Sequence, residues 1–321
     1  MLGASGFLGS ALLGALCGRA VEVRAVSRRA VAVPTAAAEG HEHRHVRADL
    51  CEPGAVAEAV DGADVVVNLV AALDGGRSWR VGVDDDVAER TNVGVNAAIV
   101  AAAGRRGGPR PVVVFTSSSS LGRARDGRVD GSEVDEPVGA YAHQKLLAER
   151  TLHAATAAGA VTGVVVRLPT VFGDGRGPSG TGRGVVATMV DHALAGRSLT
   201  MWNDGTPVRD LLYLGDAVTA LVAAIDHAHA LAGLHWVVGT GVGTPLRQLF
   251  ELVAQAVAEH TGRPPVPVIA VPPPEWSVPT DHEGHVVDAA AFRRRTGWAP
   301  TVPLAEAIRR TVGAAAPAAG R

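Results

Sequence analysis

The sequence opens with Gly3-Ala4-Ser5-Gly6-Phe7-Leu8-Gly9, a glycine-rich turn that leads into an apolar helical pattern at 9–16. Glycine permits a tight turn, lets the backbone approach a pyrophosphate closely, and allows the helix to lie near a strand. The helix N-terminus offers unpaired N–H groups to such an anion. In a chain with 39 glycines the same spacing also fits a plain turn. The motif therefore predicts a dinucleotide site only where strands and helices alternate around it.

Short apolar runs do alternate with helical patterns through the first half of the chain. This alternation is typical of a parallel sheet covered on both faces, so the expected class is α/β with a doubly wound, Rossmann-type sheet. Only Met1 and Leu2 precede the glycines, so either the central strand is a stub or the natural start lies upstream. The expected strands are 21–27, 45–50, 64–70, 111–117 and 163–168, and the expected helices are 9–16, 53–60, 87–103 and 141–157.

The second half of the chain has a different texture. A glycine-rich segment at 173–184 and a proline-rich stretch at 264–279 are too irregular for further strand–helix units. A strand-then-helix pattern at 208–227 is similar to the first half. We therefore expect an interrupted dinucleotide-binding domain and a smaller, irregular α/β substrate-binding domain. The first comprises 1–168 with 208–230 returning to it, and the second comprises 169–207 and 231–321.

Composition excludes several classes of protein. With 321 residues, 47% of them hydrophobic, the chain is long enough to bury a sizeable core, which excludes disorder. The 30 basic and 32 acidic side chains leave a net charge of −2, so no field steers the protein to nucleic acid or an anionic membrane. Cys17 and Cys51 have neither disulfide-framework nor zinc-site spacing, and no metal is expected. With no signal peptide or membrane-spanning run recognised, a cytoplasmic location is expected.

The end of the second expected strand carries Ser27-Arg28-Arg29. An NAD site has an Asp or Glu at this place for the ribose 2′-hydroxyl. A carboxylate would repel a 2′-phosphate, whereas a hydroxyl and two guanidinium groups can bind it, so NADP is favoured over NAD. The alternative is a solvated basic turn. Asp49 closes the next strand, where its carboxylate can accept a hydrogen bond from the adenine amine.

Tyr141-Ala142-His143-Gln144-Lys145 contains one of two tyrosines and the sole lysine of the chain. Residues four apart share a helix face, so the ammonium of Lys145 can lie near the phenol of Tyr141 and lower its pKa. The phenol then serves as a proton donor near neutral pH. A packed tyrosine beside a solvated lysine is the alternative.

A buried strand at 112–116 runs directly into four serines, from Ser117 to Ser120. A hydroxyl at a strand end can share a substrate carbonyl oxygen with Tyr141 and stabilise developing negative charge. On its own the serine run would be a polar turn. Its position one helix before Tyr141 favours the catalytic interpretation.

Taken together and in this order, the motifs resemble the extended short-chain dehydrogenase/reductase family, specifically its nucleotide-sugar epimerases, dehydratases and ketoreductases. The resemblance covers nearly the whole chain. It rests on Gly3, Gly6 and Gly9; Asp49; Asn68-Leu69-Val70-Ala71-Ala72; Asn92; Ser117; Tyr141 with Lys145; Arg167-Leu168-Pro169-Thr170-Val171-Phe172-Gly173; Arg209-Asp210; and Gly297-Trp298-Ala299-Pro300.

The resemblance implies Ser117, Tyr141 and Lys145 as catalytic residues, with Lys145 also holding the nicotinamide ribose. It implies that Asn92 orders the site and that Arg209 binds a sugar-nucleotide diphosphate. The expected cofactor-binding residues are Gly3, Ser5, Gly6, Phe7, Leu8, Gly9, Ser27, Arg28, Arg29, Asp49, Leu50, Leu69, Ala71, Ala72, Asn92, Tyr141, Lys145 and Pro169. The expected substrate-binding residues are Ser118, Ser119, Thr170, Phe172, Trp202 and Arg209, although the two aromatic residues also suit an ordinary core.

The residues after Ser117 discriminate between the reactions of this family. Its dehydratases have an Asp-Glu pair there, whereas this chain has Ser118-Ser119, which cannot supply that proton transfer. With Arg28 and Arg29, the resemblance favours an NADPH-dependent ketoreductase of a nucleotide-linked, dTDP-type 4-keto-6-deoxyhexose in deoxysugar biosynthesis. Alternatives are an NAD-dependent nucleotide-sugar 4-epimerase, a reductase of a non-nucleotide ketone, and a non-catalytic dinucleotide sensor. The family's habit of pairing through two long helices implies a homodimer.

Overall fold

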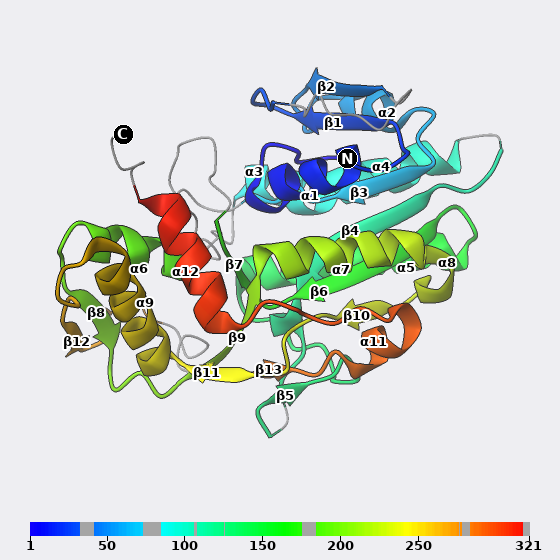
Figure 1. Ribbon diagram of the computed structural model, residues 1–321. Coiled ribbons are helices and arrows are strands. Elements are labelled where there is room, and N and C mark those ends of the chain that lie inside the picture. Colours follow the sequence, from blue (N-terminus) through cyan, green and yellow to red (C-terminus); the bar gives the residue numbers. More distant parts are fainter. Residues whose placement is uncertain are drawn as a thin grey trace.

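A parallel sheet lies at the centre of the larger part of the molecule (Figure 1). The computed structural model describes residues 1–32, 42–72, 85–105, 108–124, 126–174, 184–275, 277 and 283–316. Within these ranges the strand order is β2 (His43–Arg47), β1 (Val23–Ser27), Leu2, β3 (Val65–Asn68), β4 (Val112–Ser118), β6 (Thr162–Leu168) and β10 (His235–Val237), with every pair parallel. The expected Rossmann-type sheet is confirmed.

Leu2 alone represents the central strand. It forms parallel bridges to Val26 on one side and to Asn68 on the other. The backbone N–H of Leu2 donates to the Val67 carbonyl, and the Leu69 N–H donates to the Leu2 carbonyl. A single, almost fully buried residue therefore joins the two halves of the sheet.

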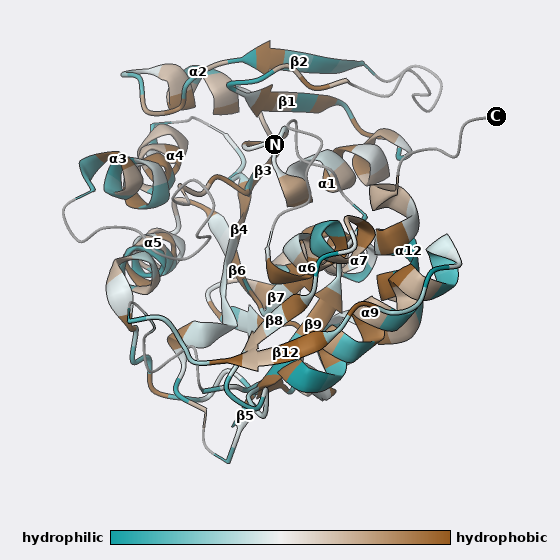
Figure 2. Ribbon diagram, turned by 90° about the vertical axis from the view of Figure 1, so that its left-hand side faces the viewer, coloured by the Kyte–Doolittle hydropathy of each residue, from teal (hydrophilic) through white to brown (hydrophobic). Residues whose placement is uncertain are grey.

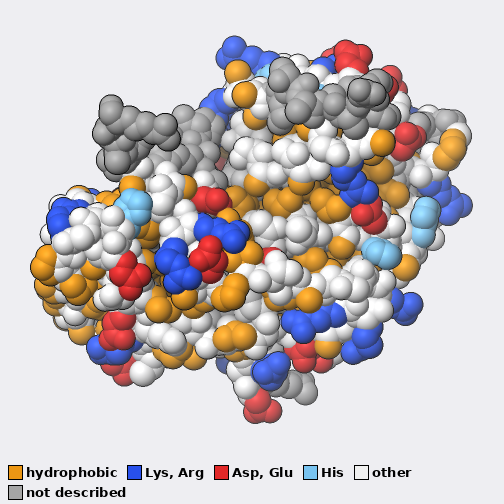
Figure 3. Space-filling model, viewed as in Figure 1, with side chains coloured by type: hydrophobic (Ala, Val, Ile, Leu, Met, Phe, Trp, Pro, Cys, Tyr) orange, Lys and Arg blue, Asp and Glu red, His pale blue; other side chains and the backbone are white. Residues whose placement is uncertain are grey.

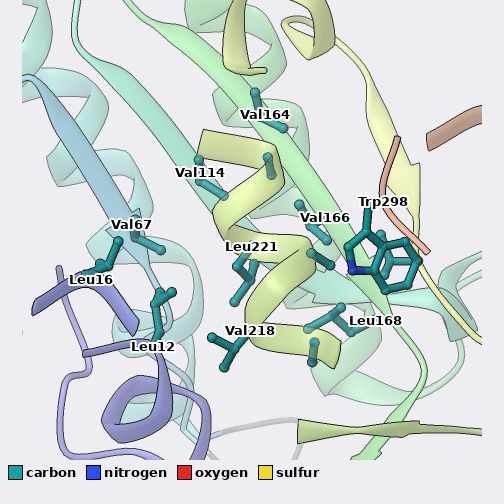
Figure 4. Packing of buried hydrophobic residues seen from close by; sticks show 14 of the residues in the cluster. Leu12, Leu16, Val67, Val114, Val164, Val166, Leu168, Val218, Leu221 and Trp298 are labelled. Carbon is teal, nitrogen blue, oxygen red and sulfur yellow. The ribbon is translucent and has the colours of Figure 1, made fainter. Parts of the chain in front are cut away.

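Helices cover both faces of this sheet (Figure 2). The strands require this, because successive side chains point to opposite faces and both sets are apolar. Val114 packs in one cluster, whereas its neighbours Val113 and Phe115 pack in another. Figure 4 shows the first cluster, in which Leu12 and Leu221 meet the strands. Its helices are α1 (Phe7–Cys17), α7 (Leu214–Asp226) and α11 (Ala290–Thr296), and those of the other face are α2 (Ala55–Val60), α4 (Val95–Gly104) and α5 (Gly139–Ala157).

The expected helix over 87–103 is continuous but not uniform. It consists of α3 (Asp86–Glu89), a π-helical turn η1 (Arg90–Gly94) and α4. The π turn places Asn92 inside the protein at 1% exposure. Such turns inside α-helices are frequent at functional sites, and apolar periodicity does not predict them.

The second domain has its own core beside the carboxyl ends of the sheet strands (Figure 1). Strand β9 (Val208–Tyr213) lies between β7 (Thr170–Phe172) and β11 (Gly243–Pro245), and β8 (Leu199–Trp202) pairs with β12 (Val268–Val271). Their apolar side chains pack against three helices. These are α6 (Val185–Leu194), α9 (Leu246–Thr261) and α12 (Leu304–Ala315).

Segments of the second half of the chain pack in both cores. Strand β9 pairs within the second domain, whereas α7 and Ala228 of segment 208–230 pack on the main sheet. Conversely, β10 extends the main sheet and α11 packs on it, although 231–321 was expected in the other domain. A three-residue edge strand has too little sequence pattern to reveal its partner. The remaining short elements are η2 (Ser119–Leu121), α8 (Ala228–Leu231), β5 (Arg128–Val129) and β13 (Val286–Val287).

Basic and acidic side chains are interspersed over the face shown in Figure 3. This mixture agrees with the nearly balanced charge of the chain. In the ranges that the structure describes, no helix combines the length and the apolar character needed to cross a bilayer.

Candidate active site

The glycine turn has the geometry that a bound pyrophosphate requires. Gly3 adopts a φ of +84°, and a Cβ placed on it would lie 3.1 Å from the carbonyl carbon of Leu69. A Cβ on Gly9 would collide with the Gly3 carbonyl oxygen. Gly6 is the N-cap of α1, whose first turn carries no acidic side chain. The motif thus opens a helix directly after the central strand, which is the context that distinguishes it from a plain turn.

Of the three residues expected to bind the 2′-phosphate at the end of β1, the two arginines are exposed and the serine is buried. Arg28 and Arg29 are exposed. Ser27 is 5% exposed, and its hydroxyl donates to the Arg29 carbonyl at 2.7 Å. Because the hydroxyl has one proton, its 3.0 Å contact with His45 is made by a donating Nε2–H of that imidazole. The structure therefore commits the Ser27 proton to the backbone and leaves the two arginines as the available donors.

The loop after β3 is held by side-chain amides. Asn68 Oδ1 accepts from the Val70 N–H at 3.1 Å, and Asn92 Oδ1 accepts from the Ala72 N–H at 2.8 Å. Asn92 Nδ2 in turn donates to Gln144 Oε1 at 2.8 Å, which links this loop to α5. Asn92 thus holds the backbone of this loop. Leu69, Ala71 and Ala72 lie in the same loop, while Asp49 caps the Cys51 N–H after β2 beside the half-buried Leu50.

Lys145 lies inside the protein and points towards the end of β4. Its side chain is 2% exposed, and its Nζ donates to the Thr116 carbonyl at 3.0 Å. The same nitrogen lies 4.6 Å from the centroid of the Phe115 ring and 5.7 Å from that of Tyr141. The i, i+4 spacing on α5 therefore brings the ammonium beside the phenol ring, as the sequence predicts.

The pKa values of this pair differ from the sequence-based expectation. Burial raises the pKa of Tyr141 to about 12, although proximity to Lys145 was expected to lower it. Burial also lowers the pKa of Lys145 to about 8, partly opposed by the charge of Glu149. Desolvation of the charged form is the largest cause for both groups, because neither keeps its hydration. At neutral pH the phenol is protonated and the amine is charged.

Ser117 presents a buried hydroxyl without a partner. Ser117 is 7% exposed, and its Oγ has no hydrogen-bond partner among the described residues. A buried polar atom that stays unsatisfied costs about 1–3 kcal/mol. A substrate oxygen at the end of β4 would supply the missing partner. Ser117 follows Thr116, whose carbonyl binds Lys145, so strand and helix converge on one place.

Ser119, one of the residues expected to bind the substrate, is buried. After β4 the chain turns into η2, which directs Ser119 inward at 2% exposure. Its Oγ lies 2.8 Å from Nε2 of His285, a residue of the second domain. Ser118 is half-buried, and its Oγ lies 2.7 Å from Ser120 Oγ. The tight turn, which sequence patterns do not resolve, thus separates the two serines.

The other expected substrate residues have different environments. Phe172 is a core residue at 2% exposure and packs edge-to-face on Tyr213, so its expected role as a pocket wall is corrected. Thr170 is exposed and Pro169 is half-buried at the β6–β7 junction. Trp202 ends β8, remote from β1 and β2 (Figure 1). Arg209 is half-buried, and its Nη1 donates to the Glu283 carbonyl at 2.6 Å.

Sequence reasoning missed the residues that support this site. Gln144 completes the network of Asn92, and Asn96 Oδ1 accepts from Asn68 Nδ2 at 3.3 Å. Arg167 is 1% exposed and paired with the equally buried Glu149, with 2.6 Å between Nη2 and Oε2. A polar residue at an otherwise apolar position of a buried element is the available signal. It identifies a candidate but not its partner.

A dinucleotide cradle and a Ser, Tyr and Lys group at the strand ends together define the class of short-chain dehydrogenase/reductase enzymes. Comparison with known families agrees with this class. A model of the NAD dependent epimerase/dehydratase family matches residues 1–239, and this chain belongs to that family.

Individual relatives carry different activities. The dTDP-6-deoxy-L-talose 4-dehydrogenase (NAD(P)(+)) of Kitasatospora kifunensis is 30% identical over 316 residues, covering 96% of this chain and 92% of that protein. The UDP-glucose 4-epimerase of Mycolicibacterium smegmatis is 30% identical over 318 residues, covering 97% and 96%. Among solved structures, MoeE5 in complex with UDP-glucose and NAD has a TM-score of 0.78 at 24% identity, covering 98% of this chain and 96% of that one.

Proposed function

We propose that this protein is an NADPH-dependent reductase of the keto group in a nucleotide-linked 4-keto-6-deoxyhexose, with dTDP as the nucleotide. The observation that carries the proposal is the unpartnered, buried Oγ of Ser117 at the strand end that Lys145 also contacts. Such an arrangement is suited to a carbonyl oxygen that becomes an alkoxide. Serines stand where the dehydratases of the family have an acid and a base.

The residues present fit a bound dinucleotide. The absence of side chains at Gly3 and Gly9 lets the turn lie close to the backbone of Leu69 and lets α1 approach Gly3, and the first turn of α1 is free of carboxylates. We assign Lys145 to the nicotinamide ribose and the loop after β3 to the ring side of the cofactor. When bound, the cofactor supplies a hydride from the nicotinamide C4 to the keto carbon.

The protein supplies the proton and stabilises the charge. Tyr141, protonated at neutral pH, donates its hydroxyl proton to the carbonyl oxygen as that oxygen gains negative charge. Ser117 donates a hydrogen bond to the same oxygen. The buried ammonium of Lys145 stabilises the phenolate that remains, because attraction between charges is strong where water is excluded. A proton from solvent then restores Tyr141.

The preference for NADPH rests on charge at the end of β1. Arg28 and Arg29 are exposed there, and the neighbouring Ser27 carries no charge. Two guanidinium groups suit a 2′-phosphate, whereas an NAD site would have a carboxylate. The choice of a dTDP-linked 6-deoxy sugar as substrate is supported by the relative from Kitasatospora kifunensis, which is named as a dTDP-6-deoxy-L-talose 4-dehydrogenase (NAD(P)(+)). Arg209 is the proposed diphosphate ligand.

A nucleotide-sugar 4-epimerase is the second candidate, because the mycobacterial UDP-glucose 4-epimerase is equally identical over a similar length. An epimerase keeps its nicotinamide oxidised between turnovers, whereas a reductase consumes one NADPH for each product. The same Tyr141 serves both reactions. The distinction therefore lies in cofactor consumption.

The deciding experiment follows NADPH absorbance during incubation of purified protein with a dTDP-4-keto-6-deoxyhexose. We expect one NADPH oxidised per sugar reduced, and slower oxidation of NADH. Turnover of UDP-glucose to UDP-galactose without NADPH consumption would replace the reductase by the epimerase. A Tyr141→Phe sample serves as the control for uncatalysed oxidation.

We also propose a homodimer that pairs α4 and α5 with their symmetry mates. Leu147 on α5 is 46% exposed and Val87 at the start of α3 is 56% exposed, so this side of the molecule carries apolar surface to bury. Light scattering gives the mass in solution. The mass of one chain would contradict the dimer.

A further inference from the structure

Three metal-ligating side chains meet at the edge of the main sheet, on elements that are far apart in the sequence. Glu149 and His153 lie one turn apart on the same face of α5, and His235 is the first residue of the edge strand β10. One possible ligand atom from each lies within 4.8 Å of the other two. The imidazole rings of His153 and His235 meet edge-to-face with centroids 6.4 Å apart.

The imidazole of His235 already uses one nitrogen for a backbone contact. His235 Nε2 lies 2.8 Å from the Gly131 carbonyl oxygen. A carbonyl only accepts, so this nitrogen carries the hydrogen and Nδ1 bears the free lone pair. The ring of His153 lies close enough to the backbone of Gly233 for that backbone to act on its pKa. A ligating imidazole that donates its second N–H to a backbone carbonyl is the usual arrangement around protein-bound metals.

The carboxylate of Glu149 is fixed by Arg167. Arg167 Nε donates to Glu149 Oε1 at 3.0 Å, and Nη2 donates to Oε2 at 2.6 Å. Each carboxylate oxygen has a second lone pair, so Oε1 keeps capacity for another ligand. Asp135 also lies 2.8 Å from Arg167 Nη2. Glu149 and Asp135 thus both lie beside the guanidinium of Arg167, and the charge of Glu149 also acts on the buried ammonium of Lys145.

We propose that Glu149, His153 and His235 form a binding site for a Zn²⁺ ion, separate from the catalytic group and independent of the proposed function. Two imidazole nitrogens and one carboxylate suit zinc, whereas calcium and magnesium prefer oxygen ligands. Zinc bonds to nitrogen or oxygen are about 2.0–2.2 Å long, so the two half-buried imidazoles must move slightly inward. Three protein ligands leave a fourth position for water.

The ion would connect α5 to β10. The main sheet ends at β10. Among the described strands, the three residues of β10 pair only with β6. An ion that binds the folded but not the unfolded chain stabilises the fold in proportion to the logarithm of its concentration. The site thus attaches the last strand of the sheet to the helix that carries Tyr141 and Lys145.

The test measures Zn²⁺ binding to metal-free, untagged protein by competition with a chromophoric chelator. We expect one ion per chain, and at least a tenfold weaker affinity in His153→Gln and in His235→Gln. His260→Gln removes an exposed histidine at the end of α9 and should bind zinc like the original protein. Glu149 is left intact, because its loss would strand Arg167 in the interior. Equal affinity in all four proteins, or no binding, would overturn the proposal.

Two further readouts separate this site from adventitious binding. Co²⁺ in place of zinc should give the intense visible absorption of a four-coordinate site without thiolate charge transfer, and Cys51→Ser should leave that spectrum unchanged. Zn²⁺ should raise the melting temperature of the original protein and of His260→Gln but not of His153→Gln/His235→Gln. A six-coordinate Co²⁺ spectrum, or equal stabilisation of the double variant, would refute the site. None of these readouts depends on the reductase activity.

Discussion

Lys145 Nζ donates a 3.0 Å hydrogen bond to the carbonyl oxygen of Thr116, the residue that directly precedes Ser117. This bond joins the helix that carries Tyr141 to the strand that ends in Ser117. The position of the ammonium is therefore set by backbone and not by solvent. Because the amine is almost fully buried, its pKa falls to about 8, while burial raises the pKa of Tyr141 to about 12.

These pKa values predict how the rate of the reaction depends on pH in the alkaline range. In the proposed reduction both groups act in their protonated forms. Above about pH 8 Lys145 loses its charge first, while Tyr141 is still protonated. We expect kcat/KM to fall above about pH 8, because this ratio reports the ionisation of the free enzyme. In Lys145→Arg, whose guanidinium stays charged, the remaining activity should persist to higher pH. If kcat/KM fell at the same pH in both proteins, the ionisation of a group other than Lys145 would be responsible.

Tyr141→Phe should lower kcat by about 10²–10⁴-fold, the usual contribution of a positioned general acid. NADPH affinity, measured by quenching of protein fluorescence, should change little because the ring remains. Tyr213→Phe is the matched control. It removes the only other phenol, which donates to Asp174 at 3.0 Å in the second domain. Comparable losses of kcat in both variants would show that Tyr141 has no special role.

Replacing both arginines after β1 tests the cofactor preference. A hydrogen bond to a charged group contributes about 1.5–3 kcal/mol, so Arg28→Ala/Arg29→Ala should weaken NADPH binding at least tenfold. NADH binding should be almost unaffected. Arg105→Ala removes an exposed guanidinium at the end of α4 and corrects for a general change in charge. Parallel changes for both cofactors would remove the argument for a 2′-phosphate site.

Two glycines of α1 predict opposite outcomes for the same substitution. Gly9→Ala should destabilise the fold and abolish cofactor binding, because its methyl group would collide with the Gly3 carbonyl oxygen. Gly14→Ala meets no atom within 4 Å and lies in the same helix, so it should stabilise the protein by about 0.5–1 kcal/mol. Chemical denaturation and NADPH titration measure both effects. Tolerance of Gly9→Ala in both assays would contradict the close approach at this turn.

Several features could be predicted from sequence because they depend on neighbouring residues. The alternation of apolar strands and helices is a local pattern, and so are the glycine turn and the four-residue spacing of Tyr141 and Lys145. These patterns predicted the parallel sheet, the glycine turn at Gly3 and the position of the Lys145 amine beside the Tyr141 phenol. The unusually short central strand at Leu2 was also visible as an oddity in the sequence.

Other features depend on how distant segments assemble. The inward turn of Ser119 towards His285, the burial of Phe172 and the return of β10 to the main sheet arise from contacts between elements. So does the desolvation that raises the pKa of Tyr141.

By itself, the amino-acid sequence determined the α/β class and the choice of the side chains proposed to react, because period and spacing act within one helix or strand. Only the tertiary structure decided which of those side chains are buried, which polar atoms lack partners, and that Glu149 and His153 lie beside His235. Burial and long-range proximity are properties of packing, and packing brings together residues that have no fixed spacing along the chain.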